Sequence, residues 1–274
     1  MNYRVSIILP VYNVSAYIMQ CLQSIHNQTL TNVEVIFVDD KGTDDSISII
    51  QEFINNNNLS KDWYIISLPT NQGPAAARNI GINAAKGEYI SFIDADDWIE
   101  PKMMEELYHM AILHNADISS SAAILDYAND KHTIMANPSV GSGIITEHMR
   151  RYLLRRYVSN FTTMLFKREW IQNFQLRFPN AKSGEDSSFM GQCYLVASRI
   201  AQSNTPNYHY VIHSNSISHR KNIFRGCDKH KAFSQLFHFA RANKLLPKYR
   251  FTLYWIYIKK VIMSSIIDYI KSYI

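Results

Sequence analysis

The sequence lacks the features that mark several classes of protein. Its three cysteines, Cys21, Cys193 and Cys227, lie far apart in 274 residues, so they form neither a disulfide framework nor a metal-binding spacing. A reducing, cytoplasmic setting fits this usage best. No uncharged apolar run reaches the roughly 18 residues that a membrane-spanning helix needs. The start, MNYRVSIILPVYN, has too short an apolar run for a signal peptide.

Concentrated charge and nucleotide fingerprints are also missing. The net charge is +5, but the basic residues are scattered, apart from RRYLLRRY at 150–157. Because the sequence shows no basic tail, nucleic acid is the least favoured of the candidate partners. No G-x-G-x-x-G follows the first apolar run and no Walker sequence is present, which weakens dinucleotide and P-loop interpretations. A basic surface still suits phosphorylated ligands or anionic membranes.

The first half of the chain alternates apolar runs with amphipathic segments. Strands are predicted at 5–9, 33–38, 63–68 and 88–94, and helices at 18–25, 44–56, 73–87 and 100–115. Strands buried on both faces and alternating with helices predict a parallel sheet of right-handed βαβ units. Because such sheets bind ligands beyond the carboxyl ends of their strands, four polar segments should converge at one edge: 10–13, 39–43, 71–73 and 94–97.

Beyond about residue 117 the pattern is less regular. It predicts a strand at 116–127 with a hairpin partner at 131–135, a helix at 147–157, and a strand then a helix over 162–172. A turn opens a helix at 183–198, a strand covers 207–213, and the chain is helical from about 222. We therefore expect one domain over 1–220, divided near 117 into 1–117 and 118–220, and a C-terminal helical segment over 221–274.

Paired aspartates end the fourth predicted strand. Asp94 and Asp96 are separated by Ala95, and in an extended segment both carboxylates would face the same way. Mg²⁺ and Mn²⁺ take oxygen ligands and bind one or two carboxylates together with substrate phosphates. Asp97 is better interpreted as a cap for the helix that enters at Pro101.

Other polar residues at this edge have two interpretations each. Asp39 and Asp40 end the second strand, where one carboxylate can cap the next helix and the other face a ligand. Arg78 is either a surface residue or a counter-charge for phosphate or carboxylate. Glu185 and Asp186 begin a helical pattern, where acidic residues are common for structural reasons alone.

Taken together, these segments resemble the inverting family 2 glycosyltransferases, which have the GT-A fold. The resemblance rests on SIILPVYN, VEVIFVDDKGTDDS, NQGPAAARNIGINAAKGEYISFIDADD and GED, in the family's order. It covers roughly residues 3–220. Lys41-Gly42-Thr43 replaces the usual x-G-S in one loop. The implied fold class is α/β, a Rossmann-like and mostly parallel sheet flanked by helices, with a C-terminal helical extension.

The resemblance implies roles for several residues in binding a nucleotide sugar. Pro10 and Tyr12 would flank the uracil base, and Asp40 would accept its N3–H. Asn71 and Arg78 would hold the base or the phosphate side of the ligand.

The resemblance also assigns the metal and the base. Asp94 would serve the ribose and the metal, and Asp96 the metal, which is Mg²⁺ or Mn²⁺ and neutralises the diphosphate leaving group. Asp186 would be the general base that deprotonates the acceptor hydroxyl. One of the late histidines His209, His213 and His219 is a candidate for a further metal ligand, with a core or surface role as the alternative for each. Arg220 is a candidate for closing over the diphosphate.

The function implied is metal-dependent, inverting transfer from a UDP-sugar to a hydroxyl of a glycan or lipid-linked glycan. One alternative is a sugar nucleotidyltransferase, but PVYNVSAY lacks the Gly-rich, basic loop of such enzymes. Another is a non-catalytic nucleotide-sugar-binding module, which the presence of both Asp96 and Asp186 disfavours. The sugar, the acceptor, the linkage and the oligomeric state stay open.

The C-terminal segment has its own pattern. Its longest uncharged run, 251–258, is too short to span a bilayer. Residues at helical spacing form a stripe that one lysine interrupts: Ile256, Lys260, Met263, Ile267 and Ile270. The pattern favours a helix packed on the catalytic domain or on a second subunit. It leaves open a peripheral contact with the inner face of the membrane.

Overall fold

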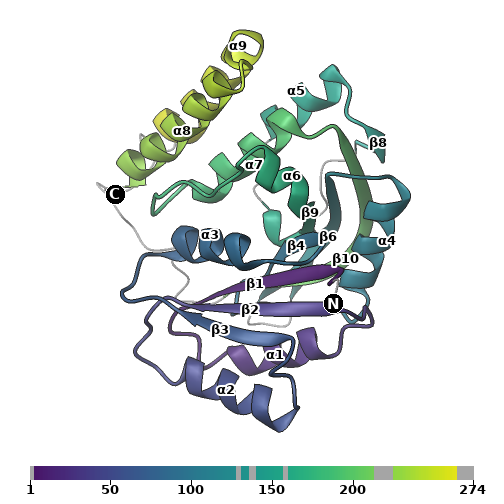
Figure 1. The fold of residues 1–274 in the computed structure, drawn as a ribbon. Helices are drawn as coiled ribbons and strands as arrows, with labels where there is room; N and C mark the ends of the chain where they lie inside the picture. Colours follow the sequence, from purple (N-terminus) through teal and green to yellow (C-terminus); the bar gives the residue numbers. More distant parts are fainter. Residues whose placement is uncertain (1–2, 128–130, 136–139, 157–159, 213–224, 264–274) are drawn as a thin grey trace.

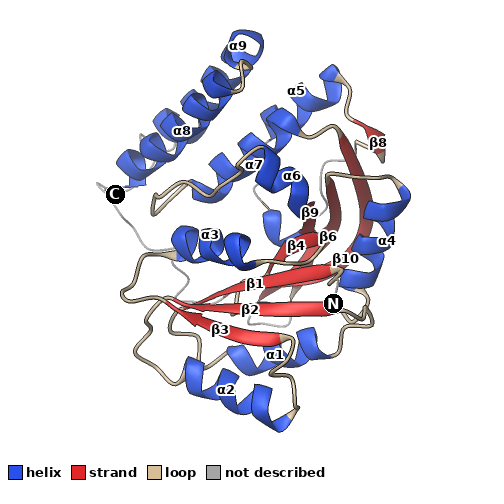
Figure 2. Cartoon of the chain, in the orientation of Figure 1, coloured by secondary structure: helices blue, strands red, loops and turns tan. Residues whose placement is uncertain are grey.

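The computed structural model describes residues 3–127, 131–135, 140–156, 160–212 and 225–263. A central sheet lies between layers of helices (Figures 1 and 2). Its strands follow the order β3-β2-β1-β4-β9-β6-β10-β5, with β7 paired to β6 and β8 paired to β10. One sheet therefore runs through both predicted parts of the domain.

The first four strands are parallel, as the alternating pattern predicted. They are β1 (Val5–Val11), β2 (Val33–Asp39), β3 (Trp63–Ser67) and β4 (Tyr89–Phe92). The helices between them are α1 (Ile18–His26), α2 (Ser46–Asn56) and α3 (Pro74–Ala84). Val5 pairs with both Val33 and Tyr89, so the carboxyl ends of these strands meet at one edge.

The second half turns the sheet into a mixed one. Its elements are β5 (Trp98–Ile99), α4 (Met103–Leu113), β6 (Ile118–Tyr127), β7 (His132–Met135), β8 (Gly143–Ile144), α5 (Glu147–Arg156), η1 (Phe161–Thr163), β9 (Met164–Lys167), α6 (Arg168–Asn173), α7 (Glu185–Val196) and β10 (Arg199–Ile212). β9 is antiparallel to both β4 and β6, whereas β10 is parallel to β6. β7 is the antiparallel partner of β6 that the sequence predicted.

Alternating side chains of β1 fill two cores, one on each face of the sheet. Ile7 and Leu9 pack with α1, α2 and α4, while Ile8 packs on the side of α3. Gly81 allows α3 to approach closely, because a Cβ atom there would lie 2.3 Å from Cγ2 of Ile8. Gly87 does not end α3, whose last residue is Ala84. Gly87 instead allows the chain to lie close to β1, because a Cβ atom at this position would lie 2.5 Å from the Ser6 nitrogen.

The C-terminal segment is helical and packs on the domain. It contains α8 (Arg225–Ala242), α9 (Leu246–Tyr257) and a π-helical turn, η3 (Ile258–Met263). α8 lies against α7, where Gly191 leaves room for the Leu236 side chain. α9 lies against α5 and α8. Among the described residues, no helix is both long and apolar enough to cross a membrane.

Candidate active site

The loops after β1 and β2 are held together by side chains at the carboxyl edge of the sheet. The Asn13 side-chain oxygen accepts the Thr43 N–H at 2.7 Å. Asp44 accepts the backbone N–H of Ser15 and the hydroxyl of Ser46. Burial alone would raise the pKa of Asp44, but these hydrogen bonds outweigh it and lower the pKa to about 2. Gly42 fits between the loops because a Cβ there would lie 2.8 Å from Asn13 Oδ1.

Asp40 fixes the loop that precedes α3. Its two carboxylate oxygens accept the N–H groups of Gln72 and Gly73 at 2.6 and 2.9 Å, and its side chain is buried. Gly73 has φ of 87°, a backbone conformation that favours glycine. Asn71 is exposed in the same loop. Asp40 therefore organises the loop, and its role toward a base stays a prediction.

The acidic segment after β4 forms a tight turn rather than an extended strand. The Asp97 N–H donates to the Asp94 carbonyl at 3.0 Å, so the expected extended alternation of Asp94 and Asp96 does not apply. Both of these aspartates are half-buried, and Ala95 between them is buried. The two carboxylates nevertheless lie near enough to Asp97 to act on it electrostatically.

Asp97 does not cap the helix after Pro101, contrary to the interpretation of the sequence. Its carboxylate accepts the Tyr208 hydroxyl at 2.5 Å and the Val211 N–H at 2.9 Å. Burial, and then the charges of Asp94 and Asp96, raise the pKa of Asp97. Asp97 thus joins the acidic turn to β10.

Arg78 is the central cation of the site. It projects from α3 into a buried position and donates to Asp94 Oδ1 at 2.8 Å. Its second terminal nitrogen lies 3.9 Å from Glu185 Oε1. The guanidinium also stacks near two aromatic rings, 4.7 Å from that of Phe161 and 5.3 Å from that of Phe178. The surface interpretation of Arg78 is therefore wrong.

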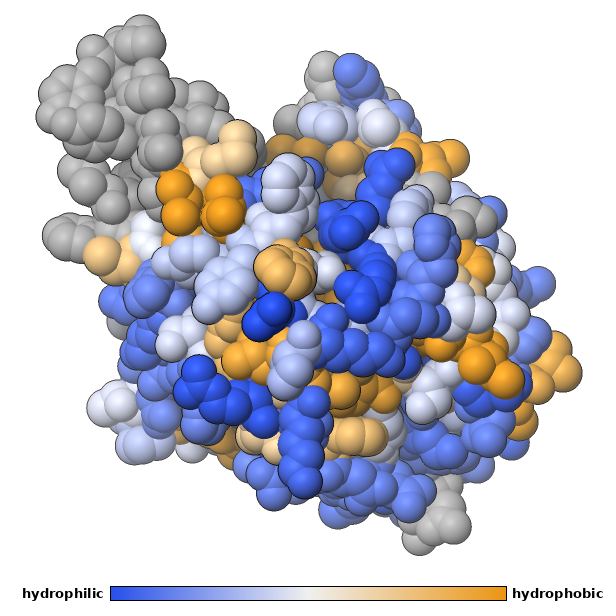
Figure 3. Space-filling view, turned by 90° about the horizontal axis from the view of Figure 1, so that it is seen from above, coloured by the Kyte–Doolittle hydropathy of each residue, from blue (hydrophilic) through white to orange (hydrophobic). Residues whose placement is uncertain are grey.

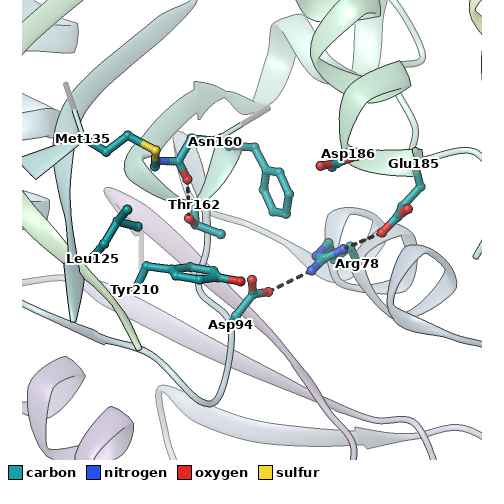
Figure 4. Close-up of a pocket in the computed structure, with 10 residues that line it drawn as sticks. Arg78, Asp94, Leu125, Met135, Asn160, Thr162, Glu185, Asp186 and Tyr210 are labelled. Atoms are coloured by element: carbon teal, nitrogen blue, oxygen red, sulfur yellow. Dashed lines mark hydrogen bonds and ion pairs between the residues drawn. The ribbon is translucent and has the colours of Figure 1, made fainter. Parts of the chain in front are cut away.

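These groups border a cavity of about 550 Å³. Figure 4 shows Arg78 between Asp94 and Glu185, with the Tyr210 hydroxyl directed toward Asp94. An apolar wall from other strands lies across from them. The lining residues are Arg78, Asp94, Leu125, Met135, Asn160, Phe161, Thr162, Glu185, Asp186 and Tyr210.

Two acidic residues at the start of α7 face this cavity. Burial, followed by the neighbouring charge of Asp186, raises the pKa of Glu185 to about 7, although Arg78 opposes the shift. Asp186 is half-buried, and one of its oxygens accepts the Ser187 N–H. Asp186 also acts electrostatically on Lys260 of η3. Perturbed titration of a buried group in a cavity is typical of functional sites.

The acidic turn fits a hard divalent cation. Within the ranges that the structure describes, no cluster of three or more His, Cys, Asp or Glu residues is arranged to hold a metal. A Mg²⁺ site does not need one, since Mg²⁺ uses one or two carboxylates and completes its shell with phosphate and water. Burial, followed by the charges of Asp94 and Asp96, raises the pKa of Asp97, so this turn gathers three carboxyl groups, of which Asp94 is paired with Arg78.

The remaining predicted residues are placed as follows. Pro10 is partly buried in β1, in register with Val38, and Tyr12 is 47% exposed in the loop beyond. His209 is stacked on Trp98, and its ring nitrogens lie 2.8 Å from Asp126 Oδ2 and 3.0 Å from Glu100 Oε1.

Both nitrogens of His209 are therefore engaged with carboxylates, which argues against a metal ligand. His213, His219 and Arg220 lie outside the described residues.

Several functional candidates escaped the sequence interpretation. Phe161, Phe178 and Tyr210 come from segments with no recognisable motif, and only the folded chain brings them to Arg78 and Asp94. The sequence shows Glu185 as one of two adjacent acidic residues, but its burial depends on residues that are distant in sequence.

The fold and the site together define an α/β protein with a ligand cavity at the carboxyl edge of its parallel strands. The family model "Glycosyl transferase family 2" matches residues 6–174. The chain therefore belongs to glycosyl transferase family 2.

Curated relatives cover most of this chain. The putative glycosyltransferase EpsH of Bacillus subtilis is 35% identical over 227 residues, which are 79% of this chain and 63% of that protein. The poly(ribitol-phosphate) beta-glucosyltransferase of Bacillus spizizenii is 32% identical over 216 residues, 76% of this chain and 32% of that protein. The chain thus spans less than two thirds of the length of either relative.

Solved structures share the fold. Staphylococcus aureus TarS 1–349 in complex with UDP-GlcNAc superposes with a TM-score of 0.73 at 24% identity, over 86% of this chain and 66% of that one. The mannosyltransferase PcManGT from Pyrobaculum calidifontis, in complex with GDP-Man and Mn²⁺, has a TM-score of 0.63 at 18% identity. The superposition covers 87% of this chain and 65% of PcManGT.

Proposed function

We propose that this enzyme transfers a hexosyl or N-acetylhexosaminyl group from a UDP-sugar to a hydroxyl of a glycan or lipid-linked glycan, with inversion in a single displacement. The observation that carries the proposal is the cavity onto which Arg78, Asp94 and Asp186 converge from three separate elements. The presence of UDP-GlcNAc in TarS and of GDP-Man in PcManGT supports a nucleotide-sugar donor. Residues 1–117 would form the nucleotide side and 118–220 the acceptor side.

Asp186 would act as the general base. It takes the proton of the acceptor hydroxyl, whose oxygen then attacks the anomeric carbon on the face opposite the diphosphate. The bond from that carbon to the diphosphate oxygen breaks, and the nucleoside diphosphate leaves with the electron pair. Inversion follows from this single displacement. Asp186 and Asp94 line the same cavity from different segments of the chain, as Figure 4 illustrates, which would place a base and a leaving group in one site.

The nucleotide would lie along the edge formed by the first four strands. Pro10 and Tyr12 flank the base, Asp40 and Asn71 recognise its edge, and Arg78 compensates phosphate charge. Arg78 suits this role because its Nε and one terminal nitrogen are buried without a hydrogen-bond partner. A buried N–H group that makes no hydrogen bond lowers the stability of the protein. A phosphate oxygen that accepted hydrogen bonds from these nitrogens would therefore bind firmly.

Asp94 and Asp96 would hold Mg²⁺ or Mn²⁺. When bound, such a cation neutralises charge on the diphosphate leaving group. The Mn²⁺ present in PcManGT supports a divalent cation in this fold. The half-buried carboxylates of the acidic turn supply oxygen ligands of the kind that these cations prefer.

The acceptor would be a surface glycan assembled at the inner face of the membrane. The name of the Bacillus spizizenii relative supports a polymer acceptor, and the net charge of +5 suits an anionic surface. A cytoplasmic enzyme in peripheral contact with the membrane would meet this requirement. Neither a sugar nucleotidyltransferase nor a non-catalytic module is favoured by a specific observation.

Release of nucleoside diphosphate from a panel of nucleotide sugars, with and without Mn²⁺, tests the proposal. We expect at least one UDP-sugar to be consumed. Asp186→Asn should keep donor binding and lower turnover by about 10²–10⁴-fold. Asp62→Asn, at the opposite edge of the sheet, is the control. Consumption of no nucleotide sugar would refute the function, and a wild-type rate in Asp186→Asn would remove Asp186 as the base.

A further inference from the structure

α9 has two faces of different character. One face is buried against α5 and α8 through Tyr249, Thr252, Leu253 and Ile256, so the expected packing on the catalytic domain is confirmed. Of the predicted stripe, Ile256 is buried on this side and Lys260 is half-buried, whereas Met263 is 52% exposed. Ile267 and Ile270 lie outside the described residues.

The opposite side of α9 and η3 is apolar and exposed. We call it the α9 outer face. Its side chains recur on successive turns, and their exposed fractions are large: Phe251 74%, Tyr254 56%, Trp255 59%, Ile258 44%, Ile262 43% and Met263 52%. Figure 3 views this end of the molecule from above and shows hydrophobic surface among hydrophilic surface. Contiguous exposed apolar surface marks an interaction site.

The charged residues of α9 and η3 themselves have one sign, and Glu147 of α5 is an acidic neighbour. Residues 244–263 contain no Asp or Glu, and their basic residues are Lys244, Lys248, Arg250, Lys259 and Lys260. Lys248 is paired with Glu147, whereas Lys244, Arg250 and Lys259 are exposed. Arg155 and Arg156 add exposed positive charge on the neighbouring α5. A partner surface must therefore be both apolar and anionic.

We propose that the α9 outer face docks onto an anionic lipid bilayer. A helix that exposes aromatic and aliphatic side chains beside lysine and arginine suits the boundary between acyl chains and anionic headgroups. A second copy of this chain fits less well. A two-fold interface would place this face against itself, and no acidic residue in 244–263 would offset its positive charge.

The proposed docking face lies close to the candidate base. η3 packs on α8, and α8 packs on α7, whose N-terminus carries Asp186. A Cβ atom at Gly184, which precedes α7, would lie 3.4 Å from the Lys229 side chain of α8. Asp186 also acts electrostatically on Lys260, whose pKa is lowered by burial. If the proposed function holds, an acceptor carried on a lipid would reach Asp186 from the docked surface.

Vesicle co-sedimentation of the full chain tests the docking. At low salt, the protein should bind vesicles of phosphatidylcholine with phosphatidylglycerol and bind much less to phosphatidylcholine alone. The double variant Phe251→Ser, Trp255→Ser should lose at least about tenfold in binding, because both side chains supply apolar contact. Ile112→Ser, Leu113→Ser is the matched control, since those α4 side chains are 47% and 79% exposed on another element. Circular dichroism and thermal unfolding establish that each variant is folded.

Three results would overturn the proposal. They are absence of binding to anionic vesicles, equal binding by the α9 variant and the wild type, and equal loss in the control variant. Light scattering tests the other candidate partner, a second copy of this chain. Such a partner would give a dimer in the wild type and a monomer in the α9 variant. Sedimentation requires no turnover, so failure of docking and failure of the proposed glycosyl transfer are measured independently.

Discussion

Glu185 should make the protein less stable as the pH rises. Its carboxyl group is buried at the start of α7, and burial followed by the charge of Asp186 raises its pKa from 4.5 to about 7. Between these values the folded protein keeps a proton that the unfolded chain has released. The free energy of unfolding therefore falls as the pH rises through this window. Glu185→Gln removes the titration and should flatten the fall.

The size of the effect follows from the same pKa values. The gap between 4.5 and about 7, at about 1.4 kcal/mol for each pH unit, corresponds to about 3 kcal/mol. That is a sizeable part of a stability of about 5–15 kcal/mol. The side chain is 15% exposed, so solvent screening reduces the figure little.

Urea unfolding at pH 5 and pH 8 measures the effect. Between these two conditions, the wild type should lose about 2–3 kcal/mol more of its unfolding free energy than Glu185→Gln loses, because a small part is already lost at pH 5. Glu52→Gln, on the exposed side of α2, controls for the removal of one negative charge. Equal losses in the wild type and Glu185→Gln would show that Glu185 is ionised as readily in the folded protein as in the unfolded chain, and the burial argument would fail.

Two further predictions concern the acidic turn. Asp96→Ala should abolish transfer and greatly weaken Mn²⁺-dependent binding of UDP while the fold persists, and calorimetric titration with undiminished binding would exclude Asp96 from the metal site. Asp97→Ala should destabilise the protein by about 2–5 kcal/mol, because it leaves the Tyr208 hydroxyl and the Val211 N–H without their acceptor in the interior. Asp97→Asn, which keeps one acceptor oxygen, should lose less, and an unfolding free energy within about 0.5 kcal/mol of wild type in Asp97→Ala would contradict this.

The parallel part of the fold was predictable because its signals are local. Continuous apolar runs at β1, β2 and β4 contain the information that they are buried on both faces. The short run at β9 carries no information on direction, so its antiparallel insertion between β4 and β6 appears only in the structure. Three of the residues to which the resemblance to family 2 enzymes gives roles, Arg78, Asp94 and Asp186, line one cavity, and those roles stay predictions.

What the sequence could not provide is the environment of each acidic residue. Asp97 looks like a helix cap because Pro101 is close in sequence, yet the hydroxyl that engages it belongs to Tyr208, 111 residues away. Glu185 looks like an acid at a helix N-terminus, where the helix dipole would favour its charge. In the folded chain, burial and Asp186 dominate instead. Residue type and spacing therefore located the acidic groups, but their ionisation depends on distant residues that enclose them.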